Sequence, residues 1–240
     1  MDAKITALDA LTAPIATDVL AIVDDPGGTP ITKKITLVNL GLIDGWIHAV
    51  GTWTYASATT ITVPSGAAAI YQKGDKFKLT ANSVVLQGYI ITVADTLLTV
   101  VGDALTNHTF TLNYYSHASN PIGFPQWFDW TPVWDSNGAM TYSSVTGTTI
   151  FCINGQAVSI IIKVAGTTAS TAATGIRATP PVPINTDNSC GASWVNDGGY
   201  KAGAFNIGGA DNIICYNSTL ASWGIGSGKS IRFNAVYQMA

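Results

Sequence analysis

Short segments in which apolar and polar residues alternate, separated by turn-forming residues, recur along most of this chain. One example is Lys76-Phe77-Lys78-Leu79-Thr80, which lies between the turns Lys73-Gly74-Asp75 and Ala81-Asn82-Ser83. Successive side chains of a β-strand point to opposite faces of a sheet, so the pattern predicts strands with one buried face. Here it places Phe77 and Leu79 in a core and the two lysines on a wet face. The recurrence of the pattern predicts an all-β protein.

The composition supports this fold class and suggests an assembly. Only 10% of the residues are charged, against roughly 25% in typical soluble domains, and no Glu occurs among the 14 acidic residues. Helices are therefore disfavoured, whereas the abundant Thr, Val and Ile suit strands. A net charge of −3 with so few charged groups suits a surface that is largely buried between subunits. We expect an oligomer; the alternative is a sparsely charged monomer.

Membrane insertion and secretion are not expected from the sequence. Apolar runs such as Val158 to Val164 are much shorter than the roughly 20 residues that cross a bilayer. The start Met1-Asp2-Ala3-Lys4 has no basic region followed by an apolar run, so we expect no secretory signal and synthesis in a cytoplasm.

Metal, cofactor and nucleic-acid binding are also not expected. Cys152, Cys190 and Cys215 form no CxxC pair, and no histidine lies at ligand spacing from them, so we expect buried free thiols and neither a metal nor a cofactor. A pI of about 5.4 with a single basic cluster at Lys73, Lys76 and Lys78 argues against a nucleic-acid partner.

The chain divides into four parts by composition and turn content. Residues 1–45 form a small N-terminal segment, residues 46–118 a small β-barrel or sandwich, residues 119–130 a linker, and residues 131–240 a jelly-roll-like β-sandwich. In the first part, Val19–Val23 and Thr29–Thr36 predict two strands, and Thr36–Gly41 predicts a short helix capped by Thr36. So short a segment has almost no core and is expected to dock onto a partner.

The two larger parts each contain a series of predicted strands. In the first series they are Gly51–Tyr55, Thr59–Val63, Lys76–Thr80, Val84–Ile91, Leu97–Val101 and Thr109–Tyr115. In the second they are Ala139–Ser144, Thr148–Ile153, Ala157–Ala165, Ser189–Asn196, Lys201–Ile207, Asn212–Tyr216 and Ser230–Gln238. Ala157–Ala165 is apolar enough for a central strand covered on both faces. The Thr/Ala/Ser-rich tract Gly166–Thr174 is expected to be flexible.

The linker, Ser119 to Trp130, combines prolines and a glycine with large aromatic residues. Its aromatics either stack around a threefold axis or plug the second β-domain, and we favour the plug.

No pattern of residues indicates an enzyme. Gly224 to Ser230 ends like a phosphate-binding loop, but Trp223 stands where the motif requires glycine, so a flexible hairpin turn is favoured. The aspartates Asp129, Asp135, Asp187, Asp197 and Asp211 form no convincing carboxylate pair for glycoside cleavage. Those in turn sequences are expected to cap local backbone amides. No Ser-His-Asp arrangement is supported either.

Carbohydrate binding is harder to exclude from the sequence than the chemistries above. Aromatic faces beside amide and carboxylate groups hold sugars, and such residues gather in the last part of the chain. The candidate site residues are Trp194, Asn196, Asp197, Tyr200, Tyr216 and Trp223. The alternative, which we favour slightly, is that these aromatics fill the sandwich core or a subunit interface. Asn196 to Tyr200 is the most loop-like stretch and the best single candidate.

Several stretches resemble fibre and receptor-binding proteins of tailed bacteriophages. Lys4-Ile5-Thr6-Ala7-Leu8, Ile22-Val23-Asp24 and Lys33-Lys34-Ile35-Thr36 are similar to the opening of many phage tail fibres and tailspikes. Tyr71 to Asp75 and Tyr114 to Ala118, with Gly123-Phe124-Pro125, are similar to a module of phage structural proteins. The resemblance covers about the first 135 residues.

The resemblance implies a virion protein, and the lack of a catalytic pattern in the sequence argues against enzymatic activity. The resemblance also implies a homotrimeric tail fibre or spike whose N-terminal segment binds other tail or head proteins of the virion, while its C-terminal domain contacts a host cell-surface glycan or protein. The candidate virion-attachment residues are Ile5, Leu8, Leu11, Ile22, Lys33, Lys34 and Leu37. The alternatives are a purely structural adaptor or head fibre of the virion, and a tailspike that depolymerises glycans.

Overall fold

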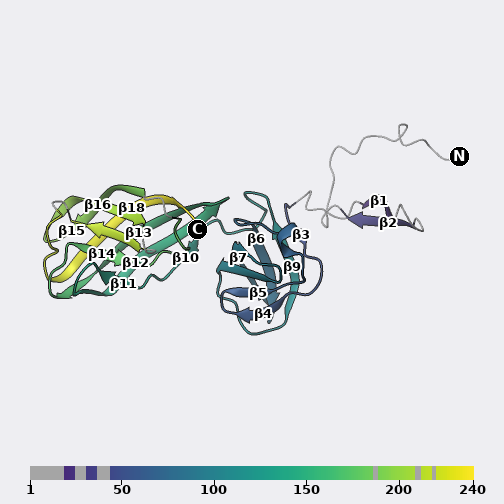
Figure 1. The fold of residues 1–240 in the computed structure, drawn as a ribbon, viewed down its shortest axis with the longest axis horizontal. Coiled ribbons are helices and arrows are strands. Elements are labelled where there is room, and N and C mark those ends of the chain that lie inside the picture. Colours follow the sequence, from purple (N-terminus) through teal and green to yellow (C-terminus); the bar gives the residue numbers. More distant parts are fainter. Residues whose placement is uncertain (1–18, 25–30, 37–43, 186–188, 209–211, 218–219) are drawn as a thin grey trace.

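A computed structural model describes residues 19–24, 31–36, 44–185, 189–208, 212–217 and 220–240. The described residues form a short hairpin and two larger antiparallel sheets, with one short 3-10 helix, η3 (Ala67–Ala69). The two larger sheets lie one after the other along the long axis of the molecule (Figure 1). The prediction of an all-β fold is confirmed.

The hairpin consists of β1 (Val19–Asp24) and β2 (Ile31–Thr36), which pair from Val19 opposite Thr36 to Asp24 opposite Ile31. Both strands were predicted. Thr36 is the last residue of β2, and the rest of the predicted helix lies outside the described residues. The same holds for the attachment candidates Ile5, Leu8, Leu11 and Leu37. Of the others, Ile22 pairs with Lys33 across the hairpin, and the side chains of Lys33 and Lys34 are exposed.

The middle sheet has seven strands in the order β3-β9-β6-β7-β8-β5-β4. Their bounds are β3 Ile47–His48, β4 Thr54–Ser57, β5 Thr60–Thr62, β6 Lys76–Ala81, β7 Val84–Val93, β8 Leu97–Gly102 and β9 Phe110–Ser116. Trp53, Phe77 and Leu79 are fully buried in its core, as the alternation in β6 predicts. The six strands predicted for this part are all present.

The predicted wet face of Lys76 and Lys78 is wrong. Lys76 is 3% exposed, and the ammonium of Lys78 lies 4.3 Å from the ring centroid of Trp46 and 5.0 Å from that of Tyr114. Both aliphatic stems can lie along apolar surface while the ammonium groups face aromatic rings. Burial lowers the pKa of both lysines. Alternation fixes which residues share a face, but it does not tell whether another segment covers that face.

The linker aromatics join the two larger sheets. Tyr89 of β7 makes ring contacts with Phe124 at 5.1 Å, Phe128 at 5.5 Å and Phe151 at 6.4 Å, measured between centroids. Its hydroxyl donates to the Gln126 carbonyl at 2.8 Å. Desolvation in this cluster raises the pKa of Tyr89 to about 12. We call the contact between the sheets the joint. Phe124 and Phe128 belong to the core cluster of the terminal sheet, as the predicted plug of the second β-domain requires, whereas Trp127 of the linker is exposed.

A backbone contact closes the joint on another side. The turn between β12 and β13 brings Gly155 against Gly74, which precedes β6. The Lys73 ammonium donates to the carbonyl of Ala240 at 2.6 Å, so the C-terminus also lies at the joint (Figure 1). The core cluster of the terminal sheet therefore extends across the joint to Trp46 and Tyr89 of the middle part, while the rest of the middle sheet has a separate core.

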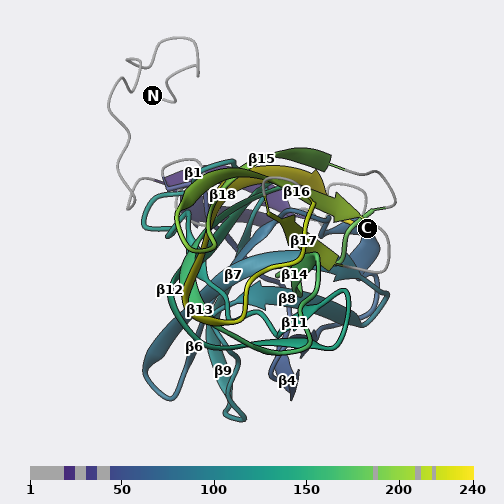
Figure 2. The same ribbon diagram turned by 90° about the vertical axis from the view of Figure 1, so that its left-hand side faces the viewer.

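The terminal sheet has nine strands in the order β10-β12-β13-β18-β15-β16-β17-β14-β11. Their bounds are β10 Phe128–Asp129, β11 Trp134–Ser136, β12 Met140–Asn154, β13 Ala157–Ser170, β14 Gly175–Ala178, β15 Ser189–Asn196, β16 Tyr200–Gly208, β17 Asn212–Tyr216 and β18 Gly226–Gln238. The edge strand β11 contacts β12 near the other edge, and the rings of Trp134 and Tyr142 lie 5.4 Å apart. The sheet therefore curls over a single core and resembles a sandwich (Figure 2).

Three details of this sheet differ from the sequence prediction. The strands predicted at Ala139–Ser144 and Thr148–Ile153 are one strand, β12, with an irregularity between Ser143 and Thr146 that lets it bend. The tract predicted to be flexible is strand as far as Ser170, because it pairs with β12. Strand β18 begins at Gly226, inside the segment predicted to be a hairpin turn.

Strand β13 is central but is covered on one face, which corrects the prediction of two covered faces. Val158, Ile160 and Ile162 are buried, whereas the alternate residue Lys163 is exposed. The curled sheet encloses its inner face, and its outer face is open on the described surface. That outer face carries the candidate site.

Candidate functional site

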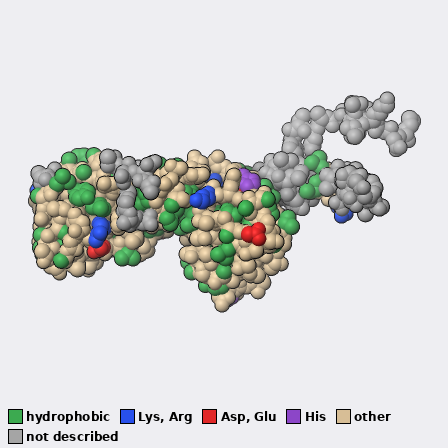
Figure 3. All heavy atoms as spheres, in the orientation of Figure 1, with side chains coloured by type: hydrophobic (Ala, Val, Ile, Leu, Met, Phe, Trp, Pro, Cys, Tyr) green, Lys and Arg blue, Asp and Glu red, His purple; other side chains and the backbone are tan. Residues whose placement is uncertain are grey.

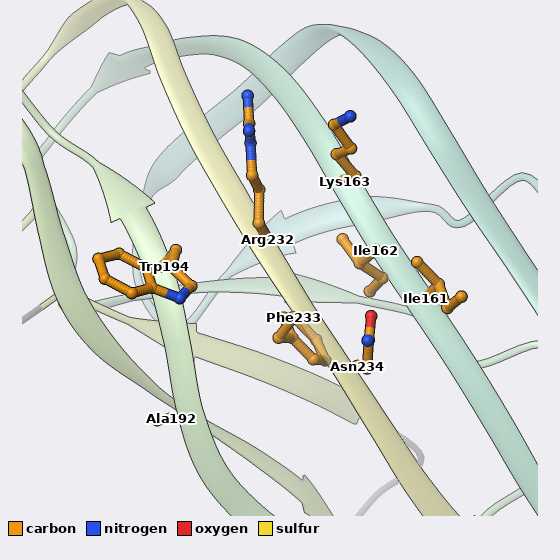
Figure 4. Close-up of a pocket in the computed structure, with 8 residues that line it drawn as sticks. All are labelled: Ile161, Ile162, Lys163, Ala192, Trp194, Arg232, Phe233 and Asn234. Atoms are coloured by element: carbon orange, nitrogen blue, oxygen red, sulfur yellow. The ribbon is translucent and has the colours of Figure 1, made fainter.

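Three adjacent strands place two cations and a tryptophan in one row on the outer face. In the register of the sheet, Lys163 of β13 lies opposite Arg232 of β18, and Arg232 lies opposite Trp194 of β15. All three side chains are exposed, Trp194 by 66%. We call these residues the cation–aromatic row. Figure 4 shows the ends of Lys163 and Arg232 projecting to the same side of the sheet.

The row borders a shallow hollow of about 420 Å³. The rest of its lining is mainly apolar and consists of Ile161, Ile162, Ala192, Phe233 and Asn234. Directly opposed residues of an antiparallel pair have Cβ atoms about 5 Å apart, so like charges there are destabilising. Within the described part of the chain, neither Lys163 nor Arg232 forms an ion pair. The hollow is thus bordered by positive charge that has no acidic partner among these residues.

The outer face continues from Trp194 towards Tyr216. Trp194 lies opposite Ala202 of β16, and Ala204 of the same strand lies opposite Tyr216 of β17. Both alanines are exposed and Tyr216 is half-buried. Adjacent strands are about 4.8 Å apart and residues rise about 3.4 Å along a strand, so the two aromatic residues are separated by about 12 Å across a smooth strip of methyl groups. This spacing suits a flat, extended ligand.

The hairpin between β15 and β16 carries two further candidates. Asn196 lies opposite Tyr200, and its side-chain oxygen accepts a hydrogen bond from the Gly199 amide at 2.9 Å. This bond fixes the turn, while the Tyr200 side chain remains 69% exposed. By alternation Asn196 and Tyr200 share the face of Trp194. Register therefore assigns Trp194, Asn196, Tyr200 and Tyr216 to one face, as a common binding site requires.

Asp197 has a structural role that the sequence did not reveal. Its carboxylate accepts hydrogen bonds from the Lys229 ammonium at 2.5 Å and from the Gly224 amide at 3.0 Å. The prediction that Asp197 caps backbone amides of its own turn is therefore wrong, because its partners Gly224 and Lys229 lie on a segment distant in sequence. The same contact gives a structural role to the segment that resembles a phosphate-binding loop. Its lysine, Lys229, binds the carboxylate of Asp197, and the segment continues as strand β18.

The Asp197–Lys229 pair predicts a loss of stability in acid. Burial raises the pKa of Asp197, but hydrogen bonds from Lys229 and Gly224 outweigh this and hold the pKa below its usual value. A carboxyl whose pKa is lowered by folding stabilises the fold above its unfolded pKa, about 3.9, and loses that effect as pH falls through the folded pKa. We expect Asp197→Asn to lower the free energy of unfolding at neutral pH by about 2 kcal/mol.

Urea unfolding as a function of pH measures this effect. The control is Asp135→Asn, since Asp135 pairs with Arg177 at 2.7 Å but is 61% exposed. Exposed pairs contribute about 0–1 kcal/mol, so the control is expected to change little. Equal losses in the two variants, or an Asp197→Asn variant that keeps the full acid sensitivity of the parent, would contradict the assignment.

Trp223 is not part of the outer face, so its selection as a site residue is wrong. It is fully buried in the core of the terminal sheet, and its backbone amide donates to the Ala173 carbonyl at 2.8 Å. For this residue the alternative that aromatics of the last part fill the core is correct. Trp194 and Tyr200 are exposed on the described chain, so these two aromatics do not fill its core.

Sequence reasoning missed Lys163 and Arg232. Each is a single cation within an apolar run, Ile161-Ile162-Lys163-Val164 and Ile231-Arg232-Phe233. A charge at an alternate position of such a run indicates an exposed face, and this signal was available. That the two cations and Trp194 form one row depends on strand pairing, which local sequence does not encode.

Groups for other chemistry are not assembled among the described residues. Asp75 is buried and pairs with His117 at 2.8 Å, and Asp129 is exposed on β10. Asp187 and Asp211 lie outside the described part. No group of three or more potential metal ligands occurs within it. Cys152 and Cys215 are free thiols; burial raises the pKa of Cys215 to about 12.

Charged side chains are sparse over the visible described surface (Figure 3), in keeping with the composition. Among the helices described, none has the length and apolarity that crossing a bilayer would demand. No family model, curated protein or solved structure matches the chain.

Proposed function

We propose that this chain is a structural fibre or spike protein of a tailed bacteriophage, without enzymatic activity. In this proposal, residues 1–45 attach to other virion proteins, and the outer face of the terminal sheet contacts a glycan on the host surface. The observation that carries the second half is the exposed Trp194 opposite Arg232, beside a hollow on an open sheet face. Exposed aromatics with neighbouring polar groups are typical of binding surfaces.

The resemblance of the N-terminal and middle segments to phage fibres supports the first half. A rigid body also suits a fibre, because contacts made by one end must be transmitted to the other. The shared core at the joint and the Gly74–Gly155 contact favour such rigidity.

The proposed assembly is a homotrimer. Three outer faces on one body would raise the effective concentration for the second and third contacts, so each site can be weak. Few surface charges favour burial of the remaining surface between subunits.

Trp194→Ala tests the binding face. We expect it to weaken binding of the full-length protein to host cells about tenfold or more, because exposed tryptophans at interfaces carry a large share of binding energy. Its stability should stay within about 0.5 kcal/mol of the parent, since the side chain is exposed. The control is Trp127→Ala, a linker tryptophan that is 42% exposed and lies outside the terminal sheet; its binding should not change.

Four outcomes would contradict parts of the proposal. Unchanged binding by Trp194→Ala would reject the outer face as the contact surface. A solution mass equal to one 25.0 kDa chain would reject the trimer. A trimer that binds virion proteins but no host cell would favour the structural adaptor, and release of soluble fragments from host glycan would favour the depolymerase.

A further inference from the structure

We propose that the cation–aromatic row binds a saccharide that carries carboxylate groups, such as a polymer of uronic acids. This inference rests on the proposed function and specifies the ligand class of the same face. The observation behind it is that two cations lie directly opposite each other beside an exposed tryptophan, without an acidic partner in the described parts of the chain.

The position of the cations calls for an explanation by function. The whole chain has eleven Lys and Arg residues and a net charge of −3, so two basic side chains in direct register are not a consequence of a basic surface. Like charges on directly opposed residues destabilise a sheet. An anion bound between Lys163 and Arg232 would remove this repulsion. Binding of an anionic ligand would thus be favoured by the loss of this repulsion, which is present in the free protein.

The other cations of this sheet have partners or lie elsewhere. Lys229 is bound to Asp197, and Arg177 to Asp135. Lys201 is exposed at the start of β16, next to Ala202, and by alternation it belongs to the opposite face from Trp194. The unpaired positive charge of the described outer face is therefore concentrated at Lys163 and Arg232, on the border of the hollow.

The three groups match different parts of an acidic sugar. The guanidinium of Arg232 can bind a carboxylate through two parallel hydrogen bonds, and Lys163 can add a point charge from the next strand. The face of Trp194 can pack against the apolar face of the same or the adjoining sugar ring. Beyond Trp194, the alanine strip towards Tyr216 gives a smooth path for further rings of a chain.

A nucleic acid fits this surface less well. Nucleic-acid binders neutralise many phosphates with a stripe or patch of basic residues. Here two cations border the hollow, and the continuation towards Tyr216 is uncharged. A neutral glycan would use Trp194 but would leave the repulsion between the cations in place. A carboxylate-bearing saccharide uses all three residues.

The experiment measures binding of the purified full-length protein to oligosaccharides of galacturonate, alginate and hyaluronan. Each is compared with its carboxyl-reduced form, which keeps the sugar rings and removes the charge. We expect at least one acidic oligosaccharide to bind about tenfold or more tightly than its reduced form, and less tightly at high salt. An oligonucleotide of similar charge is expected to bind more weakly.

The variants Arg232→Gln and Lys163→Gln test the residues. Each variant should weaken binding of the acidic oligosaccharide, and Arg232→Gln should do so by about tenfold. The affinity for the acidic oligosaccharide should then be close to that for its carboxyl-reduced form. Neither variant should lower the melting temperature, because each removes a repulsion at an exposed position. The control Lys201→Ala changes the net charge equally on the same sheet and should leave binding unchanged. Arg232→Lys keeps the charge without the planar fork and should retain part of the affinity.

The outcomes separate this inference from the proposed function. Equal binding of acidic and reduced forms, loss of affinity in Lys201→Ala as large as in Arg232→Gln, or preference for the oligonucleotide would overturn it. The inference would also be overturned if no acidic saccharide bound while the protein still bound host cells through Trp194. In that case the proposed function would stand. If the trimer binds neither cells nor saccharides, both proposals fail.

Discussion

We expect Gly74→Ala to lower the free energy of unfolding by about 3 kcal/mol, the sum of two effects. Gly74 has a φ of +89°, in the left-handed region that costs other residues about 1–2 kcal/mol. A Cβ at this position would also lie 2.2 Å from the carbonyl oxygen of Gly155. Backbone cannot yield as a flexible side chain does, so the hairpin tip of β12–β13 must move away from the middle sheet. Chemical denaturation of the full-length protein measures the loss.

Gly66→Ala separates the two effects. Gly66 has a similar φ of +86°, but a Cβ there would meet no atom within 4 Å. It should therefore show the backbone penalty alone, about 1–2 kcal/mol. If Gly74→Ala destabilises no more than Gly66→Ala, the tight approach at the joint does not exist in solution. Limited proteolysis within residues 119–130 provides a second measurement, since opening the joint should expose that segment in Gly74→Ala and leave it protected in Gly66→Ala.

We expect Trp223→Ala to be the second strongly destabilising change, by about 4 kcal/mol. The indole is fully buried in the core of the terminal sheet, and removing it leaves a large cavity. Trp223→Phe should cost much less, because Phe fills most of the space and has no polar group. The indole N–H of Trp223 has no hydrogen-bond partner in the described structure, so replacing it removes a buried polar group that is itself unfavourable.

The comparison with Trp194 makes this prediction specific. Trp194→Ala should reduce binding with little effect on stability, and Trp223→Phe should keep binding at temperatures where the protein is folded. Thermal unfolding by circular dichroism, run beside cell binding, gives both quantities for each variant. If Trp223→Ala unfolds as the parent does, the indole is not buried in solution and the assigned topology of the terminal sheet is wrong.

The fold class and most strands follow from local sequence, because alternation and turn residues act over a few positions. Lys76 to Thr80 shows both the strength and the limit of such patterns. Phe77 and Leu79 are in the core as predicted, yet Lys76 is buried and the ammonium of Lys78 lies over the ring of Trp46, which comes from a distant segment of the chain. Contacts between segments that are distant in sequence decide whether the second face of a strand is wet.

The site was predicted in part for the same reason. Trp194, Asn196, Tyr200 and Tyr216 were selected for their residue types, and register places them on one face. Lys163 and Arg232 were missed because their proximity to Trp194 arises from pairing of β13, β18 and β15. Asp197 and Trp223 were misassigned because a turn-like sequence does not reveal a partner such as Lys229, or a core that closes over an aromatic ring.

The location of the C-terminus at the joint has a practical consequence. Strand β12 runs towards the joint, β13 runs away from it, and β18 returns the chain to it, so Ala240 lies between the two larger sheets (Figure 1). A tag or fused reporter added after Ala240 would emerge beside Lys73, not from the distal end. Anchoring the protein to a sensor through such a tag would hold it by its middle and crowd the contact between the sheets.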